Sequence, residues 1–190
     1  MSCYYNASAK KFQDDDMEVD MNEFYEPFLE RLPKPAVIVD AGCGMGTDSM
    51  YFKEMGNYVI PMETSEEICR VAGENIGQSV LLCKFKDMHS KVKVNGIWAC
   101  ASLVHIPSDE LEGILLKFNL CLREKGVIYA SFGYGDFEGE REEDYYTQLT
   151  EDRANRLFTR ANFSIDKMWI TEDNRENHKG EKYLNIIAVK

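Results

Sequence analysis

Residues 37–52 of the sequence, VIVDAGCGMGTDSMYF, place glycines at every second position directly after an apolar run. Gly42, Gly44 and Gly46 carry no Cβ, so the backbone can turn sharply there and another group can approach it closely. A phosphate, a dinucleotide, another cofactor or a tight structural turn would each use such a loop. The residues around the loop distinguish between these possibilities.

The bulk composition limits the kinds of protein that this chain can be. It has 190 residues, enough for one domain with a sizeable core, and a formal net charge of −11. Such a charge repels phosphate backbones, so we expect no nucleic-acid partner. No stretch approaches the ~20 apolar residues of a membrane span, and the N-terminus lacks the apolar core of a signal peptide. We therefore expect a cytoplasmic protein without a membrane partner.

The cysteines and the acidic runs have simple interpretations. The six cysteines are scattered, with no Cys-x-x-Cys pair and no Cys/His cluster. This pattern favours free thiols over disulfides and predicts no metal site. Acidic residues gather at 14–20 and 138–144. Both runs are interpreted as solvated faces or loops.

Hydrophobic periodicity predicts strands that alternate with helices. We expect strands at 35–42, 58–62, 79–83, 96–101, 126–132, 163–171 and 183–189, and helices at 20–32, 47–55, 64–71, 107–122 and 151–161. Pro27 interrupts the first helix, which is kinked or begins there, and Thr64 with Glu67 fits a capping box. The alternation predicts an α/β fold with a parallel sheet, helices on both faces and a final antiparallel hairpin. Ligands of such sheets bind at the carboxyl ends of the strands, where the glycine loop lies.

The spacing of the loop and its acidic neighbours narrow the choice of ligand. A dinucleotide fingerprint would place its third glycine at position 47, which is Thr47, and the loop lacks the Gly-Lys-Ser/Thr of a P-loop. Asp40 and Asp48 flank the loop with negative charge, which disfavours phosphate. Glu63 ends the second strand, where a carboxylate can accept both hydroxyl protons of a ribose. These features describe a nucleoside with an amino-acid tail and no phosphate, which is S-adenosylmethionine.

Four segments in order, VDAGCGMGTDSMYF, METS, GIWACASLVHIP and GVIYASF, resemble a class I S-adenosylmethionine-dependent methyltransferase. The resemblance covers nearly the whole chain, and YYNASAKKF, GDFEGER and EKYLNIIAVK point to the small bacterial type near the tellurite-resistance methyltransferases. It implies a single domain over residues 1–190, with an N-terminal lid and helix in residues 1–32. The implied fold is α/β, a three-layer Rossmann-like sandwich. Its seven-stranded sheet is mostly parallel, with an antiparallel last strand.

The resemblance also implies which residues bind the cofactor. The glycine loop lies under the methionine moiety, the end of the second strand binds the ribose, and the segment after the third strand frames the adenine. The end of the fourth strand lies beside the sulfonium, and an N-terminal aromatic residue belongs to a lid. The implied residues are Tyr5, Asp40, Gly42, Cys43, Gly44, Gly46, Glu63, Thr64, Phe85, Asp87, Ala101, Ser102 and Leu103.

Three further residues are candidates for contact with the methyl acceptor. His105 follows the fourth strand and has an ordinary pKa near neutrality, so it is a candidate general base, with packing or loop orientation as the alternative. Arg141 and Arg175 lie in polar segments and can bind an anionic substrate through bidentate hydrogen bonds. The alternative for both is pairing with nearby acidic residues.

The function that these features predict is methyl transfer from S-adenosylmethionine to a small molecule. The compact size and the lack of an accessory domain favour a small acceptor over a protein or nucleic acid, and we expect a monomer or homodimer. Two alternatives stay open. The chain can catalyse a different reaction on the same cofactor, such as a lyase reaction, or bind the cofactor as a non-catalytic regulator. Lys84 gives the second alternative some weight, because related sequences carry an acid there.

Overall fold

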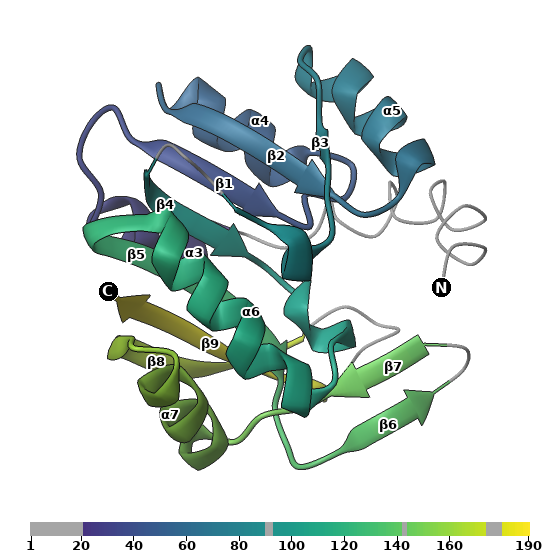
Figure 1. Cartoon of the computed structure of the whole chain (residues 1–190), viewed down its shortest axis with the longest axis vertical. Coiled ribbons are helices and arrows are strands. Elements are labelled where there is room, and N and C mark those ends of the chain that lie inside the picture. The colour runs from purple at the N-terminus through teal and green to yellow at the C-terminus, as the bar shows by residue number, and fades with distance from the viewer. Residues whose placement is uncertain (1–20, 90–92, 142–143, 174–179) are drawn as a thin grey trace.

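A seven-stranded sheet forms the centre of the computed structural model, which describes residues 21–89, 93–141, 144–173 and 180–190 (Figure 1). The strand order is β3-β2-β1-β4-β5-β9-β8. The strands are β1 (Val37–Ala41), β2 (Tyr58–Glu63), β3 (Leu81–Leu82), β4 (Val94–Ala99), β5 (Leu122–Gly133), β8 (Ser164–Glu172) and β9 (Lys182–Val189). Strands β1 to β5 are parallel, and β9 runs antiparallel to both β5 and β8. The predicted sheet is therefore confirmed, with the last strand inserted between β5 and β8.

Helices cover both faces of this sheet and produce three layers (Figure 1). They are α3 (Asn22–Leu29), α4 (Thr47–Glu54), α5 (Glu66–Ile76), α6 (Ser108–Cys121) and α7 (Glu151–Arg160), with the short 3-10 helices η2 (Phe85–Asp87) and η3 (Leu103–His105). Side chains of β1 alternate between the two cores. Ile38 packs with the buried residues of α3 and α4, whereas Val39 packs with those of α6 and α7. Two-sided burial explains why this strand is an almost continuous apolar run.

Local sequence signals account for most helix boundaries. Helix α6 begins with Asp109 and Glu110 in its first turn and buries one apolar stripe, Leu111, Ile114, Leu115 and Phe118. Helix α3 continues through Pro27, so the prediction that the helix would begin there is wrong. The proline lies in a short helix whose buried side is held by Phe24, Tyr25 and Phe28.

Two local predictions are corrected. The cap of α5 is Ser65 and not Thr64, because the Ser65 side chain accepts the N–H of Ile68 at 3.4 Å. The helix then runs to Ile76, five residues beyond the expected end, where Gly77 terminates it in a left-handed conformation. Of the two interpretations of the acidic run at 138–144, a solvated face or a loop, the described residues fit the first: β6 (Glu138–Arg141), with Glu138 and Glu140 exposed, pairs with β7 (Asp144–Thr147) in a separate two-stranded antiparallel sheet.

Neither disulfides nor long apolar helices occur in the described residues. Cys43, Cys69, Cys83, Cys100 and Cys121 are free thiols, as expected, and the remaining cysteine lies outside the described residues. Every helix in the described ranges is too short or too polar to cross a membrane.

Candidate functional site

The glycine loop lies between β1 and α4 and is held against the end of β2. The N–H groups of Gly42 and Cys43 both donate to the carbonyl oxygen of Met62, at 2.8 and 3.0 Å. Gly42 and Gly46 have φ values of 84° and 91°, in the left-handed region that side chains with a Cβ rarely adopt. The glycines are therefore explained by the backbone, which reverses from strand to helix within five residues and needs left-handed φ values to do so.

Two glycines of the loop meet different surroundings. A Cβ on Gly42 would lie 2.5 Å from the Cβ of Ser102 and 3.3 Å from Cζ of Phe85. The loop, the segment after β4 and helix η2 thus converge at one point. A Cβ on Gly44 would meet no atom of the described residues within 4 Å. The loop backbone is therefore open to a ligand at Gly44.

Glu63 lies at the carboxyl end of β2 and connects the loop to α5. Its Oε1 accepts the N–H of Thr64 at 2.5 Å and the Thr64 hydroxyl at 3.0 Å, and its Oε2 accepts the N–H of Gly44 at 3.3 Å. The residue is only 9% exposed. An ionised carboxylate has about four acceptor positions, so it can hold backbone donors and still accept hydroxyl protons from a ligand.

The chain beyond β4 has a strained backbone and an unsatisfied hydroxyl. Ala101 has a φ of 46°, and its N–H donates to the Ser131 hydroxyl of β5 at 2.8 Å. The next residue, Ser102, has a buried Oγ with no hydrogen-bond partner in the part of the chain that the structure describes. Buried polar groups are usually paired, and strained backbone tends to cluster at functional sites. Both observations fit a ligand that supplies the missing partner.

Two carboxylates lie beneath the loop and face α3 and α4. Asp40 is 1% exposed and accepts the Ser49 hydroxyl at 2.6 Å. Burial and the neighbouring Asp48 raise the pKa of Asp40 well above its ordinary value. The Asp48 carboxylate accepts the hydroxyl of Tyr25 at 2.5 Å and the indole N–H of Trp98 at 2.6 Å. Asp40 therefore underlies the loop, with its side chain directed into the α4 layer.

The Cys43 thiol is buried within the loop. Burial, with the nearby Asp40 and Glu63 carboxylates, raises the pKa of Cys43 far above its ordinary range. The sulfur is therefore held as a thiol at neutral pH and is unsuited to act as a nucleophile.

His105 ends η3 and is held by the β6–β7 hairpin. Its Nδ1 lies 3.0 Å from the carbonyl oxygen of Tyr145, and its ring packs edge-on against Tyr146 with 4.9 Å between the centroids. Arg141 lies at the end of β6, where its guanidinium carbon is 3.8 Å from the centre of the Phe137 ring. Of the other candidates, Tyr5 and Arg175 lie outside the described residues.

The remaining cofactor candidates lie near these segments. Phe85 begins η2 and is buried, with its ring edge-on to Phe118 of α6, and Asp87 ends the same turn. Leu103 begins η3 and is fully buried. Two residues that support the site, Glu138 and Ser131, are not among the candidates predicted from the sequence. Each accepts a backbone N–H from a residue 30 positions away along the chain, Ser108 and Ala101 respectively.

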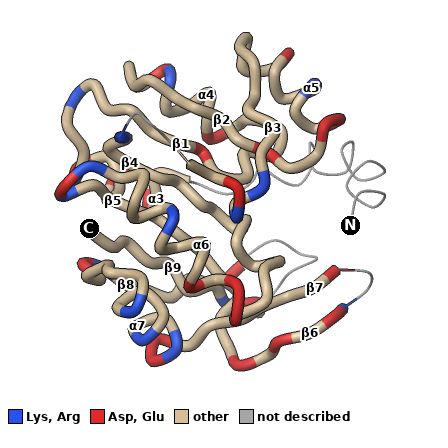
Figure 2. The backbone as a smooth tube through the Cα atoms, viewed as in Figure 1, with Lys and Arg blue, Asp and Glu red and all other residues tan. Residues whose placement is uncertain are grey.

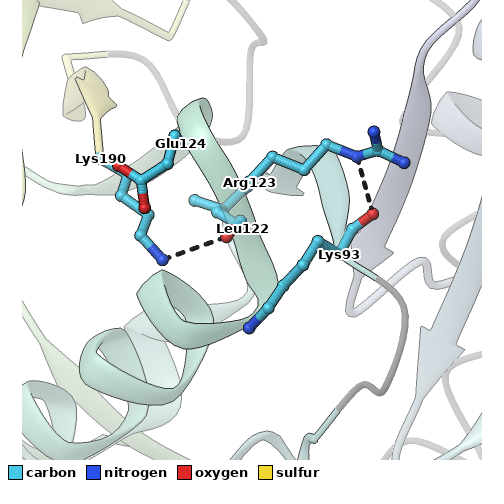
Figure 3. A pocket seen from close by; sticks show the side chains of 5 residues that line it. All are labelled: Lys93, Leu122, Arg123, Glu124 and Lys190. Atoms are coloured by element: carbon cyan, nitrogen blue, oxygen red, sulfur yellow. Dashed lines mark hydrogen bonds between the residues drawn. The ribbon is translucent and has the colours of Figure 1, made fainter.

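A concavity of about 580 Å³ lies at the opposite edge of the sheet, at the amino ends of β4 and β5 (Figure 3). Its lining residues are Lys93, Leu122, Arg123, Glu124 and Lys190. The cations there mostly bind backbone carbonyls at the C-terminus of α6. Lys190 Nζ donates to Asn119 O at 2.8 Å, and Lys93 Nζ donates to Leu120 O. This concavity is thus accounted for by helix capping and lies far from the glycine loop.

Comparison with known proteins identifies the fold. No family model matches the chain. A malonyl-[acyl-carrier protein] O-methyltransferase of Hamiltonella defensa is 31% identical over 100 residues, a match that spans 52% of this chain and 38% of that protein. The chain therefore matches only about two fifths of the length of this curated relative.

Solved structures match over much more of the chain. The 1,6-didemethyltoxoflavin-N1-methyltransferase of Burkholderia thailandensis, with bound 1,6-didemethyltoxoflavin and S-adenosylhomocysteine, has a TM-score of 0.78 at 23% identity, covering 98% of this chain and 83% of that one. A TehB-like S-adenosylmethionine-dependent methyltransferase of Corynebacterium glutamicum has a TM-score of 0.76 at 15% identity, covering 98% and 97%. The chain has the class I S-adenosylmethionine-dependent methyltransferase fold, as its sequence predicted.

Proposed function

We propose that this protein transfers the methyl group of S-adenosylmethionine to a small-molecule acceptor. The observation that carries the proposal is the convergence of three features at the carboxyl ends of adjacent strands. They are the glycine loop, the Glu63 carboxylate and the Ser102 hydroxyl, which has no hydrogen-bond partner among the described residues. This edge of an open α/β sheet is where ligands bind. The acids around the loop suit a ligand with a sulfonium and an amino group better than a phosphate.

Each segment would hold a different part of the cofactor. The loop residues Gly42, Cys43, Gly44 and Gly46, with Asp40 beneath them, would bind the amino-acid end. Residues 63–64 would hold the ribose, residues 85 and 87 would frame the adenine, and residues 101–103 would lie beside the sulfonium. Tyr5 would close over the site as part of a lid. The unpaired Ser102 hydroxyl and the open space at Gly44 support this arrangement.

The bound cofactor supplies an electrophilic methyl group with a good leaving group. The protein's own residues then need to align the acceptor, exclude water and manage a proton where the acceptor is protonated. His105 would accept that proton. Arg141 and Arg175 would contact an anionic group of the acceptor, and the stacking of Arg141 on Phe137 leaves its guanidinium edges as hydrogen-bond donors.

The cofactor assignment is tested by calorimetric titration with S-adenosylmethionine and S-adenosylhomocysteine. We expect binding by the wild-type protein and a Kd increased about 10–100-fold in Glu63→Gln, because hydrogen bonds to a charged acceptor contribute about 1.5–3 kcal/mol. The matched control is Glu67→Gln, an exposed glutamate in the first turn of α5, which should bind normally. Absence of binding to wild type at millimolar ligand would refute the proposal.

The reaction is tested by incubation with fractionated metabolite pools, read as release of S-adenosylhomocysteine with a methylated product. A small acceptor is supported by the structurally similar enzyme that holds 1,6-didemethyltoxoflavin. Cofactor binding without turnover on any pool would favour a non-catalytic regulator. Release of methylthioadenosine or adenosine without a methylated product would favour a lyase.

A further inference from the structure

The β6–β7 hairpin contacts the segment that follows β4 through hydrogen bonds and ring packing. Tyr145 O lies within hydrogen-bond distance of His105 Nδ1, and the Thr147 hydroxyl donates to Ile106 O at 2.8 Å. The ring of Tyr146 packs against the His105 imidazole. The hairpin stands apart from the main sheet, with acidic residues along β6 and at the start of β7 (Figure 2). Consecutive residues of β7 thus form one side of the environment of His105.

The contact with Tyr145 determines which nitrogen of His105 carries the proton. A carbonyl oxygen only accepts hydrogen bonds, so the 3.0 Å contact is a hydrogen bond when Nδ1 is protonated. In the neutral ring the lone pair then lies on Nε2. The position of the Tyr145 carbonyl therefore sets both the tautomer and the orientation of the imidazole.

Glu138 holds β7 in the position that this hydrogen bond requires. Its Oε1 accepts the N–H of Ser108, at the start of α6, and the hydroxyl of Tyr145, both at 3.0 Å. Its Oε2 accepts from the Arg153 guanidinium of α7, also at 3.0 Å. These donors lower the pKa of Glu138, so the carboxylate is ionised at neutral pH. One carboxylate thereby joins β6, β7, α6 and α7.

We propose that the β6–β7 hairpin is the acceptor-side wall of the site and that Glu138 is a positioning residue for His105. Glu138 fixes β7, the Tyr145 carbonyl then keeps His105 protonated at Nδ1, and Nε2 is the atom that accepts a proton. The role of His105 toward an acceptor rests on the proposed function. The tautomer and its dependence on Glu138 do not, because they are properties of the protein alone.

The first experiment measures the His105 tautomer by nitrogen-15 NMR of the histidine rings, at a pH where the imidazole is neutral. His105→Gln identifies the signal by its loss. In wild type we expect Nδ1 to show the shift of a protonated nitrogen. In Glu138→Ala we expect the signal to move toward the Nε2-protonated form. Glu138→Gln should lie between the two, because its amide oxygen still accepts from Ser108 and Tyr145.

Matched variants separate positioning from general loss of structure. Glu140→Gln removes a carboxylate from the same strand and should leave the His105 signals unchanged. Tyr145→Phe removes only the phenol bond to Glu138, so we expect a shift smaller than that of Glu138→Ala. Nε2 protonation in wild type would overturn the proposal. Unchanged His105 signals in a Glu138→Ala protein with a normal melting transition would also overturn it.

The second experiment measures kinetics once an acceptor is found. We expect Glu138→Ala to lower kcat at least tenfold while the Kd for S-adenosylmethionine changes less than twofold, because a positioned general base contributes about 10²–10⁴-fold to rate. Glu138→Gln should recover part of the loss. An equal loss in cofactor affinity would overturn the assignment. If no acceptor is methylated, the proposed function fails while the NMR result still decides the positioning role.

Discussion

Replacing Tyr25 by phenylalanine removes one hydroxyl that ties α3 to the start of α4, directly behind the glycine loop. The Tyr25 hydroxyl donates to Asp48 Oδ1 at 2.5 Å, and the residue is 4% exposed. Burial and the Asp48 carboxylate raise the pKa of Tyr25 far above its ordinary range, so the phenol stays protonated and remains a donor. The ring itself packs on Tyr51, Phe52 and Trp98, and phenylalanine keeps those contacts.

The expected loss is therefore that of one hydrogen bond to a charged acceptor. Such bonds contribute about 1.5–3 kcal/mol, so Tyr25→Phe should lower the free energy of unfolding by about 2 kcal/mol. For a chain of this size, that loss corresponds to a decrease in Tm of roughly 4–8 °C. The effect stays below that of a truncation to alanine, because no cavity forms beside the ring.

Urea unfolding followed by tryptophan fluorescence measures this change, since Trp98 lies in the same cluster and donates to the same carboxylate. Tyr51→Phe is the matched control. Its hydroxyl makes an exposed 3.4 Å contact with the neutral Asn22 side chain, so we expect a change below about 0.5 kcal/mol. Equal losses in the two variants, or no loss in Tyr25→Phe, would refute the reasoning.

Three further changes test the loop and the end of β4. Because the folded pKa of Asp40 is raised, this residue favours folding at acidic pH and loses that contribution as the pH rises through its folded pKa. Asp40→Asn should thus gain stability relative to wild type as the pH rises from 5 toward that folded pKa, by up to about 1.4 kcal/mol per pH unit in urea unfolding. Gly46→Ala should lower the free energy of unfolding by about 2–4 kcal/mol, because its Cβ would lie 2.5 Å from Ile76 and the backbone there is left-handed. Gly44→Ala should lower it by only about 1 kcal/mol but should weaken the binding of S-adenosylmethionine in calorimetry. Equal melting temperatures of the two variants would contradict this. Ser131→Ala should lower the unfolding free energy by about 0.5–1.5 kcal/mol by removing the hydroxyl that accepts the Ala101 N–H, and Ser131→Thr should restore part of it.

Much of the fold follows from signals that are local in the sequence. The apolar run of β1 and the three glycines behind it predicted a strand, a sharp reversal and a helix, and the φ values of Gly42 and Gly46 supply the cause. The repeated alternation of strands and helices predicted a parallel sheet covered on both faces, with a final antiparallel hairpin. The hydrophobic period and the conformational freedom of glycine depend only on residues close together in the sequence. They can therefore be recognised without the tertiary structure.

The ends of helices are harder to predict where two neighbouring residues can both cap the helix. Thr64 and Ser65 are both good caps, and the choice depends on Glu63, whose carboxylate takes the Thr64 hydroxyl and leaves Ser65 to cap α5. The acidic run at 138–144 has the composition of a solvated loop. Its described residues belong to β6 and β7, where Glu138 accepts hydrogen bonds from Tyr145 of β7 and from two more distant residues, Ser108 of α6 and Arg153 of α7.

The sequence alone predicted the sheet, a ligand site at the glycine loop and the kind of cofactor that suits its glycines and acids. Only the tertiary structure decided how the supporting side chains are used. Asp48 binds Tyr25 and Trp98, which lie 23 and 50 positions away along the chain, and His105 binds the Tyr145 carbonyl 40 positions away. Such contacts depend on how the layers pack, because no short-range pattern in the sequence encodes the distance between two elements after folding.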